Sequence, residues 1–345
     1  MSAKKMFLPI VHRSEMLGEL MRLKQSIAIA GTHGKTTTTS MVAAVLEAGK
    51  LDPTVVNGGI IQAYGSNARL GKGDWMIVEA DESDGTLIKI PTTIGVVTNL
   101  DSEHLEHYGT FSNLKKTFLE FLQNIPFYGV GICCLDHPVV RNLISKIRDR
   151  SILTYGFHKK ADFVIQNLNY SKRKAHFDIC DRSRARNMQL ELPMYGDHNV
   201  TNAAAAVAVG LHLNISPTII IRALKNFKGV KRRFTKIGTW NDIEIIDDYA
   251  HHPVEISAVL SAARQYSSGR VIVVHQPHIY TRLDSLMDDF CACFDEADIV
   301  GITPVYAAGE LPLEGVNSNT LISRLNAQVD KASHIEDEIG LRDFL

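Results

Sequence analysis

The chain has 345 residues, 45% of them hydrophobic and 22% charged, and a formal net charge of −1. This length exceeds what one ordinary hydrophobic core supports, so we expect two domains. The balanced charge gives no indication of a broad cationic face for nucleic acid or membrane, and no stretch approaches the roughly 20 apolar residues that span a bilayer.

The N-terminal run and the cysteines predict an intracellular protein. The N-terminal run MSAKKMFLPIVHR has only a short apolar stretch broken by proline, which makes a poor secretory signal. The cysteines are odd in number and have no repeating spacing, which argues against a disulfide framework. Two of them lie in the helix-like run DDFCACF, where we expect buried free thiols rather than a metal site. We therefore expect a reducing, cytoplasmic location.

The first two thirds of the chain alternate between helix-like and strand-like segments. In chain order we expect a helix at 14–23, a strand at 26–31, a helix at 35–49, strands at 75–80 and 93–99, a helix at 111–125 and a strand at 130–136. Such alternation predicts a parallel sheet with helices on both faces. Residues 161–195 instead alternate between apolar and polar side chains, which predicts antiparallel strands that flank the parallel sheet.

An alanine-rich helix is expected at 201–213, and a second α/β unit begins near residue 231. Its expected strands are 243–250, 270–276 and 298–306, separated by helices. The predicted fold class is thus α/β, with a central P-loop-type parallel sheet domain that carries an antiparallel flank, followed by a Rossmann-like C-terminal domain. We assign residues 24–230 to the central domain and 231–345 to the C-terminal one.

The run AGTHGKTTTT places a glycine turn between the first strand and the next helix. The turn's N–H groups and the positive end of the helix form an anion site. Lys35 is then placed to neutralise the β- and γ-phosphates of a nucleotide, and the Thr36 hydroxyl to ligate Mg²⁺. The pattern is the short G-x-x-G-K-T form, since Ile29 stands where the full Walker motif has glycine. The alternative is a structural turn with an exposed lysine.

Acidic residues follow another buried strand, at the sheet edge where the glycine turn is expected. The run EADESD contains Glu79, Asp81, Glu82 and Asp84. Carboxylate oxygens are the ligands that Mg²⁺ prefers, so the ion is expected there. His104, after the strand at 93–99, is a less expected ligand for Mg²⁺. The alternatives are a solvated acidic turn and a structural histidine.

Seven motifs occur in one order along the chain: GTHGKTTT, EADESD, TNLDSEH, YGDHNVTNAAAA, KRRF, DDYAHHPVE and QPHIYTR. As an ordered set they resemble the Mur ligase family of bacterial cell-wall synthesis. Ser83 and the QPH run favour the branch that joins L-alanine to UDP-N-acetylmuramate over the related murein tripeptide ligase. His33 separates the chain from the ligases that add later residues, which usually carry asparagine there.

For the first domain, the resemblance implies an ATP site with two Mg²⁺ ions. The phosphates would be bound by Lys35 and the residues around it, namely Gly31, Thr32, His33, Gly34, Thr36 and Thr37. Thr36 and Glu79 would hold one Mg²⁺, and His104 would help to hold the second. Asn99 would line the same edge, and adenine would be contacted by His198, Asn199 and Asn202. Without the resemblance, Asn199 and Asn202 would be read as caps of the alanine-rich helix.

For the second domain, the resemblance implies contacts to nucleotide and substrate. Arg233 would reach the phosphates, and Asp248 would meet the ribose, with Tyr249 and His251 nearby. His278 and Arg282 would face the muramoyl carboxylate and the acyl phosphate. The alternatives are a surface charge at Arg233 and a loop hydrogen-bond pair between Asp248 and His251.

The sequence departs from the family pattern in its N-terminal domain, in its C-terminal domain and at Ile279. The family's N-terminal UDP-binding domain is not found, so residues 1–23 are expected to be a linker or remnant of it, and the C-terminal domain is expected to be truncated. Ile279 stands where the family usually has arginine, which would weaken the grip on carboxylate or phosphate. Phe118 lies near the position of the carbamylated lysine of sister enzymes, as is usual for the alanine-adding branch.

We weigh three functions for this chain. The first is an ATP-dependent amide ligase with UDP-N-acetylmuramate and L-alanine as substrates and no nucleic-acid or membrane partner. The second is a non-catalytic nucleotide-binding remnant, which the expected missing domain and Ile279 favour. The third is a P-loop kinase, which leaves DHNVTN and DDYAHHP unexplained. The sequence leaves the oligomeric state open between a monomer and a weak dimer.

Overall fold

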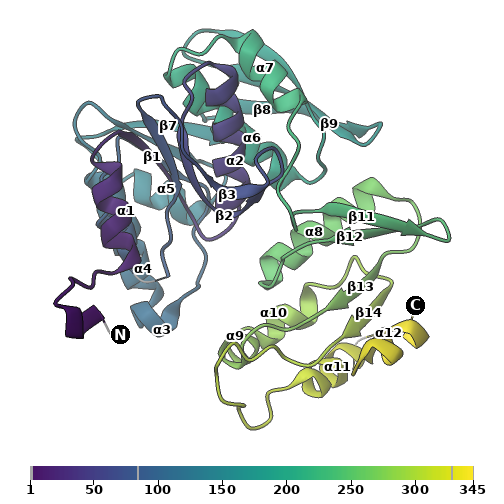
Figure 1. Cartoon of the computed structure of the whole chain (residues 1–345). Helices are drawn as coiled ribbons and strands as arrows, with labels where there is room; N and C mark the ends of the chain where they lie inside the picture. Colours follow the sequence, from purple (N-terminus) through teal and green to yellow (C-terminus); the bar gives the residue numbers. More distant parts are fainter. Residues whose placement is uncertain (1–2, 84, 328, 345) are drawn as a thin grey trace. The chain divides into compact units, whose positions relative to one another are not determined.

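The computed structural model describes residues 3–83, 85–327 and 329–344, and in it the chain forms two compact units. The first comprises Met1–Met194 and His198–Lys231, and the second Tyr195–Asp197 and Arg232–Leu345. Figure 1 labels most of the helices and strands of both.

A ten-stranded sheet forms the centre of the first unit, in the order β10-β9-β8-β7-β6-β5-β1-β4-β2-β3. The strands from β7 to β2 in this order pair in parallel, and β7 also pairs in parallel with β8. Strands β9, β10 and β3 run antiparallel to their neighbours at the two edges. The bounds are β1 (Gln25–Ala30), β2 (Thr54–Ile61), β3 (Ser66–Arg69), β4 (Trp75–Glu79), β5 (Ile94–Val97), β6 (Val130–Cys134), β7 (Ser151–Gly156), β8 (Phe163–Ser171), β9 (Lys174–Asp181) and β10 (Arg186–Leu192).

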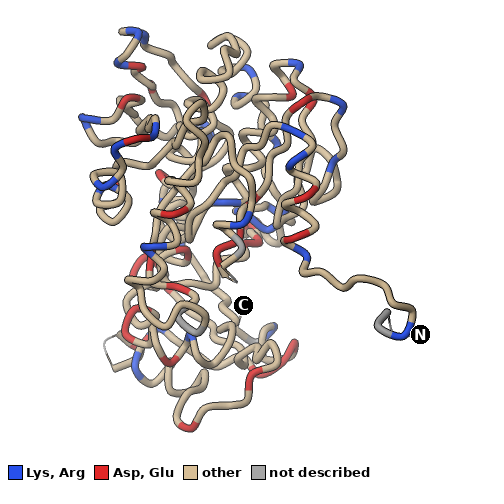
Figure 2. The backbone as a smooth tube through the Cα atoms, turned by 90° about the vertical axis from the view of Figure 1, so that its left-hand side faces the viewer, with Lys and Arg blue, Asp and Glu red and all other residues tan. Residues whose placement is uncertain are grey.

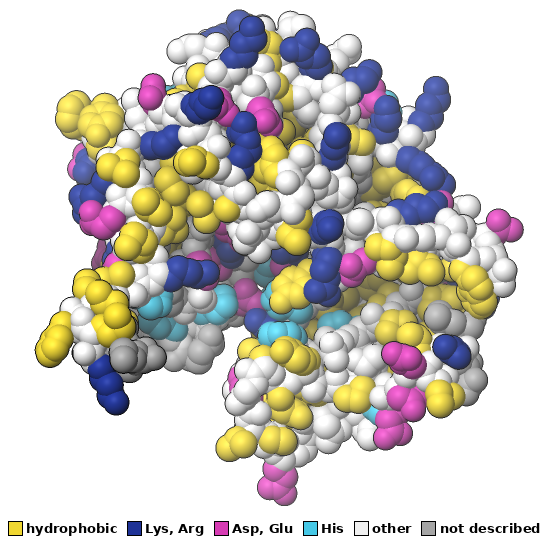
Figure 3. Space-filling view, viewed as in Figure 1, with side chains coloured by type: hydrophobic (Ala, Val, Ile, Leu, Met, Phe, Trp, Pro, Cys, Tyr) yellow, Lys and Arg dark blue, Asp and Glu magenta, His cyan; other side chains and the backbone are white. Residues whose placement is uncertain are grey.

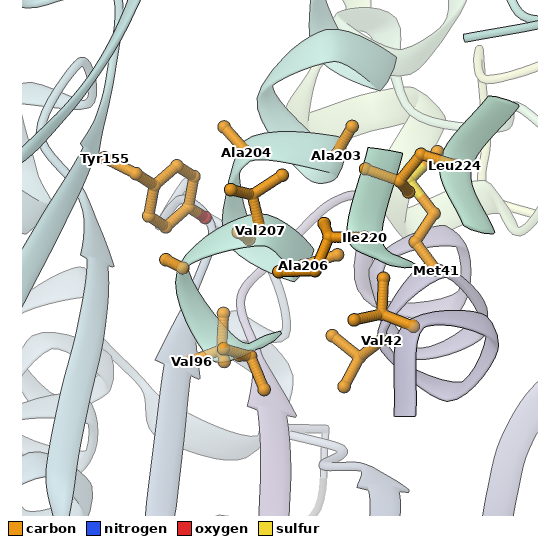
Figure 4. Close-up of a cluster of buried hydrophobic side chains, with 14 of the residues drawn as sticks. Met41, Val42, Val96, Tyr155, Ala203, Ala204, Ala206, Val207, Ile220 and Leu224 are labelled. Atoms are coloured by element: carbon orange, nitrogen blue, oxygen red, sulfur yellow. The ribbon is translucent and has the colours of Figure 1, made fainter. Parts of the chain in front are cut away.

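Helices cover both faces of this sheet and bury a separate hydrophobic cluster on each. One cluster is formed with α2 (Lys35–Ala48), α6 (Asp197–His212) and α7 (Pro217–Lys225). Figure 4 shows Ala203, Ala204 and Ala206 of α6 in this cluster; such small side chains allow a close approach of the helix. The other cluster involves α1 (Arg13–Met21), α4 (Phe111–Gln123) and α5 (Pro138–Ile144). Short elements η1 (Ala3–Met6), η2 (Thr86–Ile88) and α3 (Leu105–Tyr108) complete the unit.

The second unit contains two small sheets. Strands β13 (Ile272–His275), β14 (Ile299–Ile302) and β15 (Ala332–His334) pair in parallel, and β11 (Thr235–Trp240) and β12 (Ile243–Asp247) form an antiparallel hairpin. The helices are α8 (Pro253–Tyr266), α9 (Tyr280–Ser285), α10 (Met287–Ala292), α11 (Ser318–Asn326) and α12 (Glu338–Phe344). A hydrophobic cluster around Phe290 and Phe294 forms its core.

The predicted elements of the first unit are confirmed within a few residues, and β8–β10 confirm the antiparallel flank. The strand predicted at 243–250 is confirmed as β12, but its antiparallel pairing with β11, outside the parallel sheet, was not predicted. The reason is local. Asn241 and Asp242 have φ of 45° and 63°, and two such residues form the tight turn of a two-residue hairpin. The strands at 54–69 were not predicted.

Charged residues of both signs are interspersed along both units, as their positions on the backbone in Figure 2 and their side chains on one face in Figure 3 show. None of the helices within the described ranges combines the length and apolar character needed to cross a bilayer. The cysteines of the run DDFCACF are buried free thiols, as expected, at α10 and its C-terminal end. Burial raises the pKa of the Cys291 and Cys293 thiols, which keeps them protonated and unreactive.

Candidate active site

The sheet order places three motif-bearing loops side by side. Strand β1 lies between β4 and β5, and the register aligns Ile29 with Glu79 and Ala30 with Val97. Each of the three strands runs directly into one of the motifs: GTHGKT after β1, EADESD at the end of β4 and TNLDSEH after β5. Because the strands are parallel, these loops all leave the sheet at its carboxyl edge.

The glycine turn is held against the loop that follows β5. Gly31 has φ of 136°, and a Cβ there would lie 2.0 Å from Thr98 Oγ1. Thr98 Oγ1 donates to the His33 carbonyl at 2.7 Å, and the His33 N–H donates to Asn99 Oδ1 at 2.7 Å. The Asn99 side chain therefore holds the glycine turn in place through the backbone of His33. Thr32 also takes part, because its Oγ1 accepts from the Asp101 N–H at 2.8 Å.

We expect Gly31→Ala to lower the free energy of unfolding of the first unit by about 3 kcal/mol and to abolish nucleotide binding, because the new methyl group displaces Thr98. Gly65→Ala is a matched control, since Gly65 also has a positive φ, of 64°, but nothing lies within 4 Å of its Cβ position. This control should cost only about 1 kcal/mol. Urea denaturation and ATP titration measure both effects, and equal losses in the two variants would contradict the role of this contact.

Lys35 lies at the first position of α2 and donates from Nζ to three oxygens. The acceptors are the Gly31 carbonyl at 2.6 Å, the Thr32 carbonyl at 3.0 Å and Glu82 Oε1 at 2.7 Å. Burial alone would lower the pKa of Lys35, but the charge of Glu82 outweighs it and the pKa is raised. The lysine is therefore a fixed cation at the mouth of the turn, and the alternative of an exposed lysine is wrong.

Thr36 and Glu79 are in contact, as a shared cation would require. The Thr36 hydroxyl donates to Glu79 Oε1 at 3.0 Å, and the backbone N–H of Gly58, in β2, donates to Oε2 at 2.7 Å. A Cβ on Gly58 would lie within 3 Å of this carboxylate, so any larger residue there would displace the Glu79 side chain. On the inner side, Ser40 Oγ donates to the Thr36 carbonyl and accepts from Asn57 Nδ2 at 3.0 Å.

His33 belongs to a charge cluster around Asp101. Its Nε2 lies 3.3 Å from Asp101 Oδ2, and His137 Nε2 lies 3.3 Å from Oδ1. Burial works against the carboxylate, but the two imidazoles hold the pKa of Asp101 well below its usual range. Asp101 is thus ionised at neutral pH and fixes the orientation of His33 on the glycine turn.

His104 lies close to two carboxylates, those of Glu82 and Glu103. Its Nε2 lies 3.8 Å from Glu82 Oε1 and 3.9 Å from Glu103 Oε2, and ligand atoms of the three residues lie within 4.8 Å of one another. This oxygen-rich donor set, together with the Thr36–Glu79 pair, fits Mg²⁺. Asp81 accepts from the Ser83 N–H and stabilises its own turn. Asp84 lies outside the described residues.

The asparagines of the HNVTN run lie inside α6 and do not cap it, so the capping alternative is wrong. Asn199 and Asn202 are 3% and 6% exposed. Asn202 lies against the glycine turn, because a Cβ on Gly34 would be 2.7 Å from Asn202 Oδ1. His198 precedes them in the first turn of the helix, and Thr37 is buried in α2.

In the second unit, the Asp248 carboxylate connects two backbone segments near the start of the domain. Its two oxygens accept from the Phe234 and Ala250 N–H groups, each at 2.7 Å, and burial raises the pKa of its carboxyl. These bonds tie the KRRF run to the DDYAHHP run. The Arg233 guanidinium lies 3.9 Å from Glu255 and 5.9 Å from the centre of the Tyr249 ring.

His251 and His278 bring two motifs of this unit together, with ring centres 5.7 Å apart. Arg282 Nη1 lies 3.4 Å from His278 Nδ1, and burial together with this guanidinium lowers the pKa of His278. Ile279 between them has φ of 62°, which is a strained backbone for a β-branched side chain. Such strain is typical of segments that hold a functional group in place.

Comparison with known proteins decides the family. Residues 29–210 match the model described as the Mur ligase middle domain, and residues 232–341 match the Mur ligase, glutamate ligase domain. The chain belongs to the Mur ligase family. The resemblance expected from the seven motifs is thereby confirmed.

This Mur ligase is similar to proteins named UDP-N-acetylmuramate–L-alanine ligase. It is 59% identical to that of Roseobacter denitrificans over 94% of this chain and 69% of the relative, and 56% identical to that of Rhizobium meliloti over 99% and 74%. The solved UDP-N-acetylmuramate–alanine ligase of Thermotoga maritima has a TM-score of 0.83 at 27% identity, over 99% of this chain and 74% of that one. A murein peptide ligase from Psychrobacter arcticus, with a TM-score of 0.71 at 21% identity, shares the fold.

Sequence reasoning about this Mur ligase missed several residues at the site. Gly58 donates to Glu79 and Asn57 donates to Ser40, both from a strand that was not predicted; the glycines of the run VNGG are a signal of close backbone approach. Asp101 and His137 were given no role. Glu82 was placed in the acidic cluster, but its pairing with Lys35 was not foreseen.

Proposed function

We propose that the chain ligates L-alanine to the carboxylate of UDP-N-acetylmuramate at the expense of ATP, in the cytoplasmic synthesis of peptidoglycan precursors. The observation that carries the proposal is the convergence of Lys35, Thr36, Glu79 and His104 at the carboxyl edge of β1, β4 and β5. The names of the relatives supply the substrates. We propose that residues 24–230 form the central ATP-binding domain and that residues 231–345 form the C-terminal domain, which would add further contacts to nucleotide and substrate.

The first step activates the acid. A carboxylate does not react with an amine in water, because hydroxide is a poor leaving group. The carboxylate oxygen attacks the γ-phosphorus, the bond from this phosphorus to the β–γ bridging oxygen breaks, and ADP leaves. Negative charge from triphosphate and carboxylate gathers at this point, and Lys35 at the mouth of the turn offsets it. We propose the same role for Arg233.

The second step forms the amide bond. The neutral amino group of alanine attacks the acyl carbon, the carbon–oxygen bond to the phosphoryl group breaks, and inorganic phosphate leaves as the nitrogen loses a proton. We propose that His278 and Arg282 bind the muramoyl carboxylate and the acyl phosphate, since an imidazole and a guanidinium lie within 3.4 Å of each other there. Asp248, with Tyr249 and His251, would bind the ribose, and His198, Asn199 and Asn202 the adenine.

Two groups of donor atoms support a proposal of two Mg²⁺ ions: the Thr36–Glu79 pair and the group that contains His104. We propose that Thr36 and Glu79 hold one ion and that His104 helps to hold the other. The ions would supply positive charge to the transferring phosphoryl group. The hydrogen bond from Gly58 fixes the Glu79 carboxylate in the orientation that it would use.

The function is tested by release of phosphate from ATP in the presence of UDP-N-acetylmuramate. We expect release that depends on L-alanine and is lost in Lys35→Ala. Release that depends instead on the tripeptide L-Ala-γ-D-Glu-meso-diaminopimelate would favour the murein tripeptide ligase. Tight ATP binding without release under any condition would favour the non-catalytic remnant, and both outcomes would overturn the proposal.

In a chain that also carries the family's UDP-binding domain, Ile279→Arg is expected to raise the affinity for UDP-N-acetylmuramate about tenfold, because it adds a guanidinium beside His278 that can bind a carboxylate or phosphate with two hydrogen bonds. Ile279→Gln is the control, since it has a polar side chain without charge and the same strained backbone. Calorimetric titration with the UDP-sugar measures both variants. An unchanged affinity in Ile279→Arg would contradict this prediction.

A further inference from the structure

All three donors of the Lys35 ammonium group already have protein acceptors: two loop carbonyls and Glu82. A phosphate oxygen can bind this group only by replacing one of them. The carbonyls of Gly31 and Thr32 are part of the turn itself and cannot withdraw without unfolding it. Glu82 lies on a different loop, so it is the acceptor that a phosphate replaces.

After such an exchange Glu82 would be a buried carboxylate that has lost its ion-pair partner. Its side chain is 1% exposed, and within the described residues its Oε2 has no hydrogen-bond partner. Lys35 is its close cation, at 2.7 Å. A buried carboxylate that loses its cation carries a large desolvation penalty, and the arriving triphosphate has the same sign of charge. A second cation at Glu82 would remove this penalty.

The residues around Glu82 are suited to hold that cation. His104 Nε2 lies 3.8 Å from Glu82 Oε1, and ligand atoms of Glu82, Glu103 and His104 lie within 4.8 Å of one another. Two carboxylates and an imidazole can bind a divalent ion with their oxygen and nitrogen atoms. Two features hold this group in place: the Tyr108 hydroxyl donates to the Glu82 carbonyl, and His104 keeps a left-handed backbone with φ of 56°.

We propose that Glu82 is an exchangeable counter-ion that couples metal to nucleotide: it pairs with Lys35 until a phosphate takes the lysine, and then ligates a divalent cation together with Glu103 and His104. The metal site of the second ion thus includes Glu82 and Glu103. Because such coupling is reciprocal, Mg²⁺ tightens ATP binding by the same factor as ATP tightens Mg²⁺ binding.

The test is a calorimetric titration of the chain with ATP, in excess EDTA and in saturating Mg²⁺. In Glu82→Gln we expect the affinity for metal-free ATP to rise about tenfold, because phosphate no longer competes with a carboxylate for Lys35. The factor by which Mg²⁺ improves the affinity should fall about tenfold, because a ligand of the ion is lost. Glu103→Gln should reduce the Mg²⁺ factor without raising the metal-free affinity, since Glu103 is not an acceptor of Lys35.

Glu191→Gln is the matched control, because Glu191 also pairs with lysines, Lys174 and Lys225, but lies on β10. It should behave as the unmodified chain. A Mg²⁺ factor that is unchanged within about twofold in Glu82→Gln would overturn the proposal, and so would a lower metal-free affinity in a folded variant. If Glu82→Gln does not fold, an unchanged Mg²⁺ factor in Glu103→Gln overturns it instead.

This inference rests on the nucleotide-binding part of the proposed function, but not on the ligation. The titrations contain neither UDP-N-acetylmuramate nor L-alanine. Coupling through Glu82 in a chain that releases no phosphate would leave the inference standing and end the ligase proposal. Alanine-dependent phosphate release with an unchanged Mg²⁺ factor in Glu82→Gln would do the reverse.

Discussion

Lys35→Met should lower the free energy of unfolding of the first unit by about 3 kcal/mol, because it leaves Glu82 as a buried carboxylate without its cation. The methionine side chain fills similar space but offers no charge. Glu82 is 1% exposed, so water cannot replace the lost ammonium group as its partner. The same burial raises the pKa of the Glu82 carboxyl. Urea denaturation at neutral pH, followed by circular dichroism, measures the loss.

The double variant Lys35→Met with Glu82→Gln separates this cause from the loss of packing. Since both charges are then absent, most of the stability lost in Lys35→Met should return, although neither variant binds ATP normally. Lys174→Met serves as a control, because Lys174 also pairs with a glutamate but is more exposed, and its loss should cost less than about 1 kcal/mol. Equal costs for the two lysines would show that the Lys35–Glu82 pair is not energetically special.

The second unit should lose about 3 kcal/mol of stability as the pH falls from about 7 to 4, and His275→Phe should remove that loss. His275 is 5% exposed and packs beside the rings of Phe290 and Phe294. Burial, with a smaller contribution from the charge of His251, lowers the pKa of His275 to about 4. Its Nε2 has no hydrogen-bond partner among the described residues, so phenylalanine suits the site better.

The direction of this effect follows from the lowered pKa. Above the unfolded value of about 6.5 both states hold a neutral imidazole, and the histidine contributes no pH dependence. Between about 6.5 and 4 the unfolded chain takes up a proton that the folded unit refuses, so stability falls with pH. Thermal unfolding at several pH values measures this. His334→Gln, at an exposed histidine of β15, should retain the loss; a flat profile in the unmodified chain would refute the prediction.

The fold was predictable to the extent that it depends on local pattern. Buried runs such as 26–31 and 75–80 read as strands because their apolar residues are continuous, and the glycine turn read as a phosphate loop because its residue types suit little else. The hairpin of the second unit was not predicted, since nothing in the run at 243–250 indicates whether its partner is parallel or antiparallel. Only the left-handed Asn241–Asp242 turn decides that.

The site was predictable by residue type but not by pairing. Glu79 and His104 were expected at the sheet edge because each follows or ends a strand. Which carboxylate of EADESD would pair with Lys35 could not be predicted, because the acidic side chains of this run have the same chemistry. The choice falls on Glu82 because of two distant partners, Lys35 and the hydroxyl of Tyr108, that only the folded chain brings to it.

The contact between Gly34 and Asn202 joins residues from the two ends of the first unit. The phosphate turn is consequently complete only after α6 has been synthesised and has docked on the sheet, so a nascent chain cannot bind nucleotide early. Any ligand of this turn selects the finished unit over all partly folded forms. At about one hundred times its dissociation constant, such a ligand adds about 2.7 kcal/mol to the stability of the unit and slows its degradation in the cell.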